Sequence, residues 1–345
     1  MSSFSLQAQN KIEKTCKNGI GILEFLPGKN YLVTGATGFL GKAIIEKLLR
    51  AAPNVSQIYL LIKAENEEAA LERIKTEIID SNLFDLVRYM HGKSYQDFML
   101  SKVVPIPGNI GESNLGMNPD LMMEIAKEVD VIINSAANTT FDERFDVAVS
   151  INTRGPSRVL DFAKKCKKLC CFIHIYQLID KNREEIPVAI VRPSVIESTF
   201  KEPYPGWLQG IRMADPFILA DGKGYLPAFI NPEAVIDIIP VDMVVNAIIS
   251  AMAKHGITWK QELNVYHITS SRVNPVKLKF IFDMCFEHFK FESSDTYKLW
   301  EAMSLEEQLS FGFDVQCLDW KDYFYNIHMP GLRKYVMKSK LRPKL

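Results

Sequence analysis

The sequence predicts an α/β protein with a doubly wound parallel sheet and a smaller, mostly helical C-terminal domain. Short apolar runs rich in β-branched residues alternate with segments of helical periodicity from Asn30 to about residue 256. Parallel neighbouring strands need a crossover, which is normally a helix. From Ile257 onward the alternation stops and the apolar spacing becomes mostly helical. A glycine-rich turn after the first strand is the third observation that favours this class.

Each predicted element follows from its apolar spacing. The strand "YLVT", the helix "GKAIIEKLLRAA" and the strand "IYLLIKA" make one βαβ unit. The later elements are a charged helix over 65–80, a strand in 102–110, a helix and a strand in 121–140, a helix and a strand in 147–175, a strand in 187–196, and a strand and a helix in 235–256.

Composition narrows the class of protein. Of the 345 residues, 47% are hydrophobic and 24% are charged, as in ordinary globular proteins. Lys and Arg together number 41, as do Asp and Glu, so nucleic acid is not an expected partner. The N-terminus lacks a signal-peptide pattern, and no apolar run reaches the roughly 18 residues of a membrane span. We therefore expect an intracellular protein that does not cross a membrane.

The C-terminal tail is the one stretch with a marked charge bias. The tail "GLRKYVMKSKLRPKL" carries six basic residues and no acidic one. This pattern is typical of a solvated chain end, and the alternative is a peripheral contact with a membrane surface.

The cysteines lack paired spacing, so reduced thiols and no metal site are expected. They are Cys16, Cys166, Cys170, Cys171, Cys285 and Cys317.

The turn "YLVTGATGFLG" places Gly35, Gly38 and Gly41 at G-x-x-G-x-x-G spacing between a buried strand and a helix. Such glycines allow a tight turn, close approach of a pyrophosphate to the backbone, and close packing of the helix on the strand. The N–H groups at the start of the helix favour phosphate binding. The turn therefore predicts a dinucleotide site, and a purely structural turn is the alternative.

We expect the chain to divide into an N-terminal segment 1–28, a Rossmann-type cofactor domain 29–256 and a helical domain 257–345.

The end of the second strand indicates which dinucleotide is bound. An acidic residue there would bind the ribose 2′-hydroxyl, whereas a cation accommodates a 2′-phosphate. The strand ends at Lys63 and no carboxylate precedes Glu65, so NADPH is preferred over NADH. The next two strands end at the same edge of the sheet. Residues that follow them are expected to line the adenine and ribose pockets, namely Asn109, Ile110, Ser135 and Ala136.

Four stretches together resemble plant fatty acyl-CoA reductases, which are extended short-chain dehydrogenases with a C-terminal sterility domain. They are "TGATGFLG", "NSAANTTFDERFDVAVSINTRGP", "IVRPSVIEST" and "PGWLQGIRMADPF", and "FGFDVQCLDWKDYFYNIHMPGLRKYV" is similar to the sterility domain. The resemblance covers nearly the whole chain. It implies reduction of a long-chain acyl-CoA through an aldehyde to a primary alcohol, with NADPH as the hydride donor. It also implies a cytoplasmic site or a peripheral one on the endoplasmic reticulum, with the plastid left open.

The resemblance also implies roles for individual residues. Asn152 matches an asparagine that helps to hold a proton-relay water, and a helix-capping role is the alternative. Pro193 and Ser194 match the segment beside the nicotinamide ring. Lys63 matches a basic residue that binds the 2′-phosphate. The pyrophosphate loop that the resemblance implies comprises Gly35, Thr37, Gly38, Phe39, Leu40 and Gly41.

The family's catalytic tyrosine and lysine are missing after the fifth strand. That chemistry needs a Tyr and, four residues later, a Lys on the same helix face. The nearest candidates are Tyr176 and Lys181 at a spacing of five, which turns the side chains about 140° apart on a helix. His174 is expected to be a hydrogen-bonded structural histidine.

The short connection at residues 176–187 and a second shortening near "FEHFKFESSDTYKLWEAMS" indicate a shortened family member. The main functional prediction is an NADPH-dependent fatty acyl-CoA reductase. A catalytically inactive, cofactor-binding homologue is the first alternative, because the Tyr-x-x-x-Lys segment is absent after the fifth strand. A short-chain dehydrogenase or epimerase acting on sugars is the second. That alternative also needs the missing pair and does not explain the C-terminal helices.

Overall fold

The computed structural model divides the chain into two compact units. The first unit comprises residues 1–191, 248–265 and 302–307, and the second comprises residues 192–247, 266–301 and 308–345. Each unit is described by itself. The structure describes residues 19–139, 142–175, 183–212, 215–216, 234–259, 262–277 and 294–337.

A seven-stranded sheet forms the centre of the first unit, with the order β10-β6-β5-β4-β1-β2-β3. The strands from β1 to β6 pair in parallel. Strands β2 and β3 extend the sheet from one side of β1, and β4, β5 and β6 extend it from the other. The strand order therefore reverses at β1, as in a doubly wound fold. The predicted fold class is confirmed. The strands are β1 Tyr31–Thr34, β2 Ile58–Ile62, β3 Val103–Pro107, β4 Val131–Asn134, β5 Cys171–Ile175, β6 Val188–Pro193 and β10 Leu263–Ile268, with β6 and β10 continuing into the second unit.

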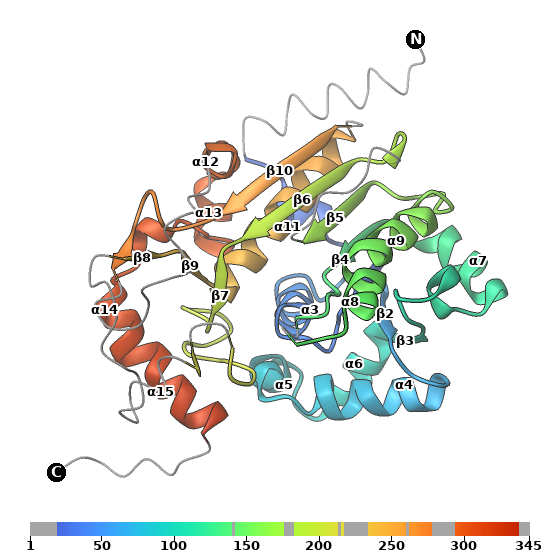
Figure 1. Cartoon of the computed structure of the whole chain (residues 1–345), viewed down its shortest axis with the longest axis horizontal. Helices are drawn as coiled ribbons and strands as arrows, with labels where there is room; N and C mark the ends of the chain where they lie inside the picture. Colours follow the sequence, from blue (N-terminus) through green and yellow to red (C-terminus); the bar gives the residue numbers. More distant parts are fainter. Residues whose placement is uncertain are drawn as a thin grey trace. The chain divides into compact units, whose positions relative to one another are not determined.

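Helices cover both faces of this sheet. Leu32, Ile132 and Phe172 form one buried cluster with residues of α7 and α9. Right-handed crossovers then put α3 on the opposite face, where it packs against α5, and α5 packs against α6 (Figure 1). The helices with residues in this unit are α2 Ile22–Phe25, α3 Phe39–Ala51, α4 Glu67–Ile74, α5 Asp85–His91, α6 Tyr95–Lys102, α7 Pro119–Glu128, α8 Phe145–Val149, α9 Gly155–Ala163, α11 Val241–Thr258 and α13 Leu305–Ser310.

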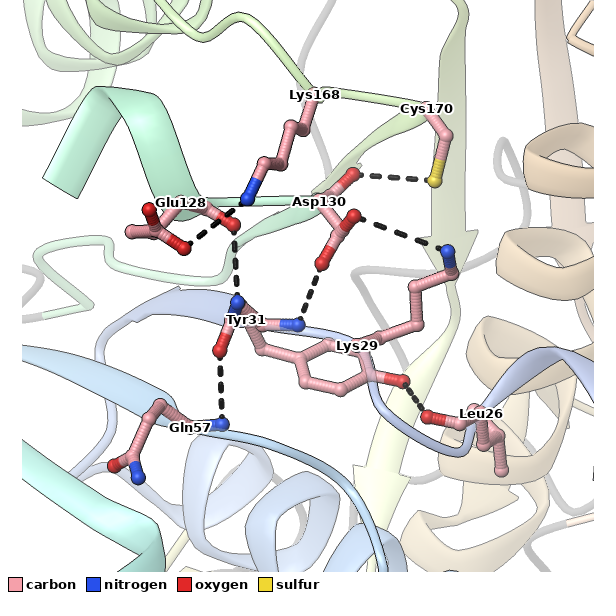
Figure 2. A network of polar contacts seen from close by, with 9 residues as sticks. Leu26, Lys29, Tyr31, Gln57, Glu128, Asp130, Lys168 and Cys170 are labelled. Carbon is pink, nitrogen blue, oxygen red and sulfur yellow. Dashed lines mark hydrogen bonds and ion pairs between the residues drawn. The ribbon is translucent and has the colours of Figure 1, made fainter.

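A polar network ties the amino ends of the strands together (Figure 2). Asn30, just before β1, donates its backbone N–H to Asp130 Oδ2 at 2.8 Å and accepts from the backbone of Gln57 at 3.0 Å. The Tyr31 hydroxyl donates to the Leu26 carbonyl at 3.1 Å. Burial raises the pKa of Tyr31 well above its ordinary value, so this hydroxyl stays protonated. The network holds β1, β2 and β4 in register at the edge where these strands begin.

Glu307 joins the start of the chain's described part to α13. Its carboxylate accepts the backbone N–H groups of Ile20, Gly21 and Ile22 at 2.5–2.9 Å. It also accepts from the Ser304 N–H at 2.8 Å, while Ser304 Oγ accepts from the Glu307 N–H at 3.3 Å. The second pair of bonds is a capping box at the start of α13. Burial raises the pKa of Glu307, but the four backbone donors outweigh it, so the net pKa is lowered.

We predict that Glu307→Gln lowers the free energy of unfolding by about 2 kcal/mol, because its amide NH2 must face backbone N–H donors in either orientation. A lowered folded pKa contributes stability above the unfolded pKa, and this is lost as the pH falls through the folded value. Wild type should therefore lose stability below about pH 4.3, and the variant should lose less there. Thermal unfolding across this pH range, with exposed Glu306→Gln as the control, checks the prediction. Equal pH slopes in the three proteins would contradict it.

The second unit combines two short strand pairs with helices. β7 and β9 pair in parallel, and β8 and β11 pair antiparallel. These strands are β7 Val195–Glu197, β8 Val235–Ile236, β9 Ile238–Pro240 and β11 Val276–Lys277. The helices are α12 Ser294–Glu301, α14 Trp320–Asp322 and α15 Met329–Gly331, with π-helical turns at Tyr323–His328 and Leu332–Val336. The mostly helical C-terminal region is confirmed.

The structure adds a strand after the predicted end of the cofactor domain. β10 lies beside β6 in the sheet, although the sequence from Ile257 onward shows no strand alternation that predicts it. The predicted domain boundary near Gly256 stays a prediction, and Gly256 itself lies within α11. Within the described part of the chain, no helix combines the length and the apolar character that a bilayer span requires.

Candidate functional site

The candidate site lies at the carboxyl edge of the parallel sheet in the first unit. Parallel register pairs Thr34 of β1 with Leu61 of β2 and with Asn134 of β4. Ile62 of β2 pairs with Pro107 of β3. The segments that follow these strands therefore begin at one edge. Open α/β sheets bind their ligands there.

The glycine turn between β1 and α3 is closely packed at two of its three glycines. Gly35 has φ +71°, and a Cβ there would lie 2.8 Å from the Ala136 backbone. A Cβ on Gly41 would overlap the Gly35 carbonyl. A side chain at either position would therefore force the turn away from β4 or α3. These two glycines have the predicted structural tasks of a tight turn and close helix packing.

Gly38 differs because the described part of the chain leaves space beside it. Among the described residues, a Cβ there would meet only the Gly35 carbonyl oxygen, at 3.2 Å, and its φ of −78° suits any residue. Gly38 is the N-cap of α3 and, as a glycine, provides no side-chain cap. The N–H groups of the first turn therefore face a space that a side chain would fill. This cradle fits the pyrophosphate of a dinucleotide.

Sequence reasoning did not find a buried polar chain that crosses the ends of three strands. Thr34 Oγ1 donates to Asn134 Oδ1 at 2.6 Å, and Asn134 Nδ2 lies 3.1 Å from His174 Nδ1. Because the Asn134 amide nitrogen is a donor, His174 Nδ1 is the acceptor and this imidazole is neutral. Ser135 Oγ and the Ala136 N–H also bond to Thr34. His174 is a hydrogen-bonded buried histidine, as expected, and it fixes the end of β5.

Lys63 follows β2 at this edge and is exposed. A second cation, which sequence reasoning missed, comes from α4. Arg73 donates to the Lys63 carbonyl at 2.8 Å and to Thr37 Oγ1 of the glycine turn at 3.4 Å. Its Nε also forms an ion pair with Glu77 at 2.6 Å. Arg73 lies in a charged helix, where one more arginine gives no sequence signal.

The residues after β3 have different surroundings. Asn109 forms a local turn, accepting from the Gly111 N–H at 2.9 Å and donating to Glu112 at 2.8 Å. Ile110 is buried in the cluster beneath α9, and a Cβ on Gly155 would lie 2.9 Å from its Cδ1. Asn109 is thus the more accessible of the two at this edge.

Asn152 lies in the π-helical turn Ser150–Arg154 between α8 and α9. Its Oδ1 accepts from the Asn138 N–H at 2.7 Å, and its Nδ2 donates to the Asn138 carbonyl at 2.9 Å. This two-bond contact holds the loop that follows β4. The side chain therefore positions the loop, and its role toward a proton-relay water stays a prediction.

The structure does not test the remaining predicted residues. Tyr176 and Lys181 lie outside the described residues. Pro193 ends β6, and Ser194 donates its N–H to the Ile268 carbonyl at 3.0 Å. Both belong to the second unit, so their position beside a nicotinamide stays a prediction.

Comparison with known proteins extends this picture. A family model of an NAD-binding domain, described as male sterility protein, matches residues 33–176 and 177–248. A second model of the same description, for the sterile domain, matches residues 278–339. The first match begins within β1 and covers the glycine turn and the carboxyl edge of the sheet. The chain therefore contains a nicotinamide-cofactor domain followed by a sterile domain.

Curated relatives include chloroplastic fatty acyl-CoA reductase 2 of Arabidopsis thaliana, 35% identical over 94% of this chain and 81% of the relative. Its alignment runs over 497 residues, more than the 345 of this chain, so the relative carries segments that this chain lacks. An alcohol-forming fatty acyl-CoA reductase of Simmondsia chinensis is 34% identical over 78% of this chain and 72% of the relative.

Solved structures agree on the fold. The reductase domain of a nonribosomal peptide synthetase from Mycobacterium tuberculosis has a TM-score of 0.56 at 19% identity, over 87% of this chain and 84% of that one. The Bordetella bronchiseptica enzyme WbmF, solved in complex with NADH, has a TM-score of 0.50 at 16% identity, over 90% and 96%. With two family models and relatives above 30% identity along most of its length, the chain belongs to the fatty acyl-CoA reductase family.

Proposed function

We propose that this chain is an NADPH-dependent, alcohol-forming fatty acyl-CoA reductase. The observation that carries the proposal is the open cradle at Gly38, which lies between two packed glycines in a chain of this family. One long-chain acyl-CoA would take up two hydrides and two protons, in two steps through the aldehyde. The C–S bond to CoA breaks in the first step, and the CoA thiol and a primary alcohol are the products.

The residues of the first unit divide the work of holding the cofactor. Gly38 and the first turn of α3 would bind the pyrophosphate, and Asn109 and Ala136 would border the adenine and ribose. The bound nicotinamide supplies hydride. Hydrogen bonds that link Thr34, Asn134 and His174 hold the end of β5 in place. Tyr176 follows this strand directly in the sequence. We assign Tyr176 as the candidate proton donor, with Lys181 as its candidate partner.

Asn152 in the first unit has a proposed role of its own, and so have Pro193 and Ser194 in the second unit. The two bonds from the Asn152 amide to Asn138 support a role in shaping the loop above the cofactor edge. The chloroplastic relative supports a plastid location for this chain, and the basic residues of the C-terminal tail support a peripheral membrane contact.

The preference for NADPH rests on two cations, and it predicts the effect of removing them. Lys63→Ala and Arg73→Ala should each weaken NADPH binding about 10-fold, equal to about 1.4 kcal/mol, and leave NADH binding nearly unchanged. The reason is that only NADPH carries a 2′-phosphate. Fluorescence titration of both cofactors measures the effect, and exposed Lys75→Ala is the control. Equal weakening of NADH and NADPH would show that the cations support the glycine turn and do not select the cofactor.

A product assay tests the proposed function. The purified full chain is incubated with NADPH and palmitoyl-CoA, and fatty alcohol is measured by gas chromatography beside Gly38→Val. We expect alcohol from wild type and none from the variant, with two NADPH consumed per alcohol. Tyr176→Phe should abolish the product while NADPH still binds. NADPH binding by wild type without any aldehyde or alcohol would overturn the proposal and identify an inactive homologue.

A further inference from the structure

The second unit contains a buried polar array around His328 that the proposed function does not use. His328 Nδ1 lies 2.8 Å from Ser198 Oγ, and its Nε2 lies 3.1 Å from Asp215 Oδ1 and 4.0 Å from Glu197 Oε2. The side chains of His328, Asp215 and Glu197 are all 0% exposed. Glu197 ends β7, whereas His328 ends a π-helical turn 131 positions later.

Hydrogen-bond geometry assigns the protons on one side of this array. The Tyr323 hydroxyl lies 2.6 Å from the Ser198 carbonyl oxygen, which can only accept, so Tyr323 donates there. Burial raises the pKa of Tyr323 well above its ordinary value, which keeps that proton in place. Ser198 Oγ lies 2.9 Å from the same hydroxyl, and it must donate its own proton to the Tyr323 oxygen. With that proton used, Ser198 Oγ accepts from His328, so His328 Nδ1 carries a hydrogen.

The other nitrogen of His328 then faces two acceptors. In a neutral imidazole with Nδ1 protonated, Nε2 presents a lone pair. That lone pair points at a carboxylate oxygen of Asp215 only 3.1 Å away. Glu197 Oε2 lies 4.0 Å from the same nitrogen. A lone pair buried against carboxylates is unfavourable unless a positive charge lies between them.

A proton on Nε2 serves this arrangement less well than a metal ion. The proton could bond Asp215, but Glu197 Oε2 at 4.0 Å is beyond hydrogen-bond reach of Nε2. Among these three side chains, imidazolium and two carboxylates would leave a net negative charge, whereas a divalent ion and a neutral histidine would leave none. Because burying charge away from water is costly, the closer charge balance among these three groups favours the ion.

We propose that Glu197, Asp215 and His328 bind one divalent transition-metal ion, for which Zn²⁺ is the best match. One ligand atom from each residue lies within 4.8 Å of the others. Zinc binds His nitrogen and carboxylate oxygen at about 2.0–2.2 Å, which sets neighbouring ligand atoms roughly 3.4 Å apart in a tetrahedron. The bond from Nδ1 to Ser198 is the outer contact that orients metal-bound histidines. The ion would link β7 to the helical turn at Tyr323–His328 within this unit.

The test measures metal content and stability in the full chain, independent of activity. The protein is expressed in Zn²⁺-supplemented medium, passed through gel filtration and analysed by plasma mass spectrometry. We expect about one Zn²⁺ per chain in wild type and in His91→Gln, a control in the other unit, and under a tenth of that in His328→Gln. Glu197→Gln provides a second variant with a smaller change in size. Co²⁺ added to chelated protein should produce visible absorption bands in wild type and His91→Gln and none in His328→Gln.

The melting temperature of wild type provides a second test, which does not depend on whether a variant folds. Chelated wild type should melt at a lower temperature than untreated protein and recover when Zn²⁺ is added, because an ion that binds only the folded state stabilises it. Wild type without bound metal, with a melting temperature that neither chelation nor Zn²⁺ changes, would overturn the proposal. It would assign a proton to His328 Nε2.

Discussion

Gly38→Val should weaken NADPH binding at least about 100-fold, equal to about 2.7 kcal/mol, while the chain stays folded. The valine side chain would occupy the cradle at the start of α3, where the proposed pyrophosphate approaches the backbone. The fold should tolerate it, because φ at Gly38 is −78° and a Cβ meets only one atom of the described residues, at 3.2 Å. Isothermal titration with NADPH and thermal unfolding measure the two effects separately.

Gly28→Ala is the matched control. Gly28 has φ +69°, and no atom of the described residues lies within 4 Å of an added Cβ, so the substitution strains the backbone by about 1 kcal/mol without filling a site. It should lower the melting temperature and leave NADPH affinity unchanged, the reverse of Gly38→Val. NADPH binding by Gly38→Val at wild-type affinity would show that the cofactor does not occupy this turn.

Asp242→Asn should lower the free energy of unfolding by about 3 kcal/mol. Asp242 lies at the start of α11 and is buried. Its Oδ1 accepts from the Phe200 N–H at 2.8 Å, and its Oδ2 accepts from the N–H groups of Lys201 and Glu202 at 2.8 and 3.0 Å. An asparagine NH2 group would face at least one of these donors, whichever way the amide is turned. Chemical denaturation of both proteins measures the loss.

The pH dependence provides a second check on Asp242. Burial raises its pKa, although the three backbone donors oppose the shift. A raised carboxyl pKa means that the folded state binds the proton more tightly than the unfolded state. Wild type should therefore lose part of its stability as the pH rises from about 4 through the folded pKa, a loss that Asp242→Asn lacks. The exposed Asp295→Asn should match wild type in slope, and a flat wild-type profile would contradict the assignment.

Much of the carboxyl edge of the sheet was predictable from sequence because its signals are local. The strands at 31–34 and 58–62 and the intervening helix have apolar periodicity that their own residues establish. The three glycines are needed within seven residues of chain. Ile110 follows a strand as expected and belongs to the buried cluster, and its place beside the adenine and ribose stays a prediction.

The rest of the site could not be predicted, because the partners are far apart in sequence. Arg73 reaches Thr37 across 36 positions, and nothing in the intervening pattern indicates that contact. β10 has only six residues and joins the sheet beside β6, whose partner residues are more than 70 positions earlier. Tertiary packing overrides weak local preference in such short strands.

The sequence by itself determined the fold class, the glycine turn and the resemblance to one family, because periodicity and turn chemistry act between near neighbours in the chain. Only the tertiary structure decided which polar groups meet. Ser198 and His328 are 130 positions apart, and Glu307 and Ile20 are 287 apart. A buried polar side chain must find a partner once water is removed, and the identity of that partner depends on the whole packed chain.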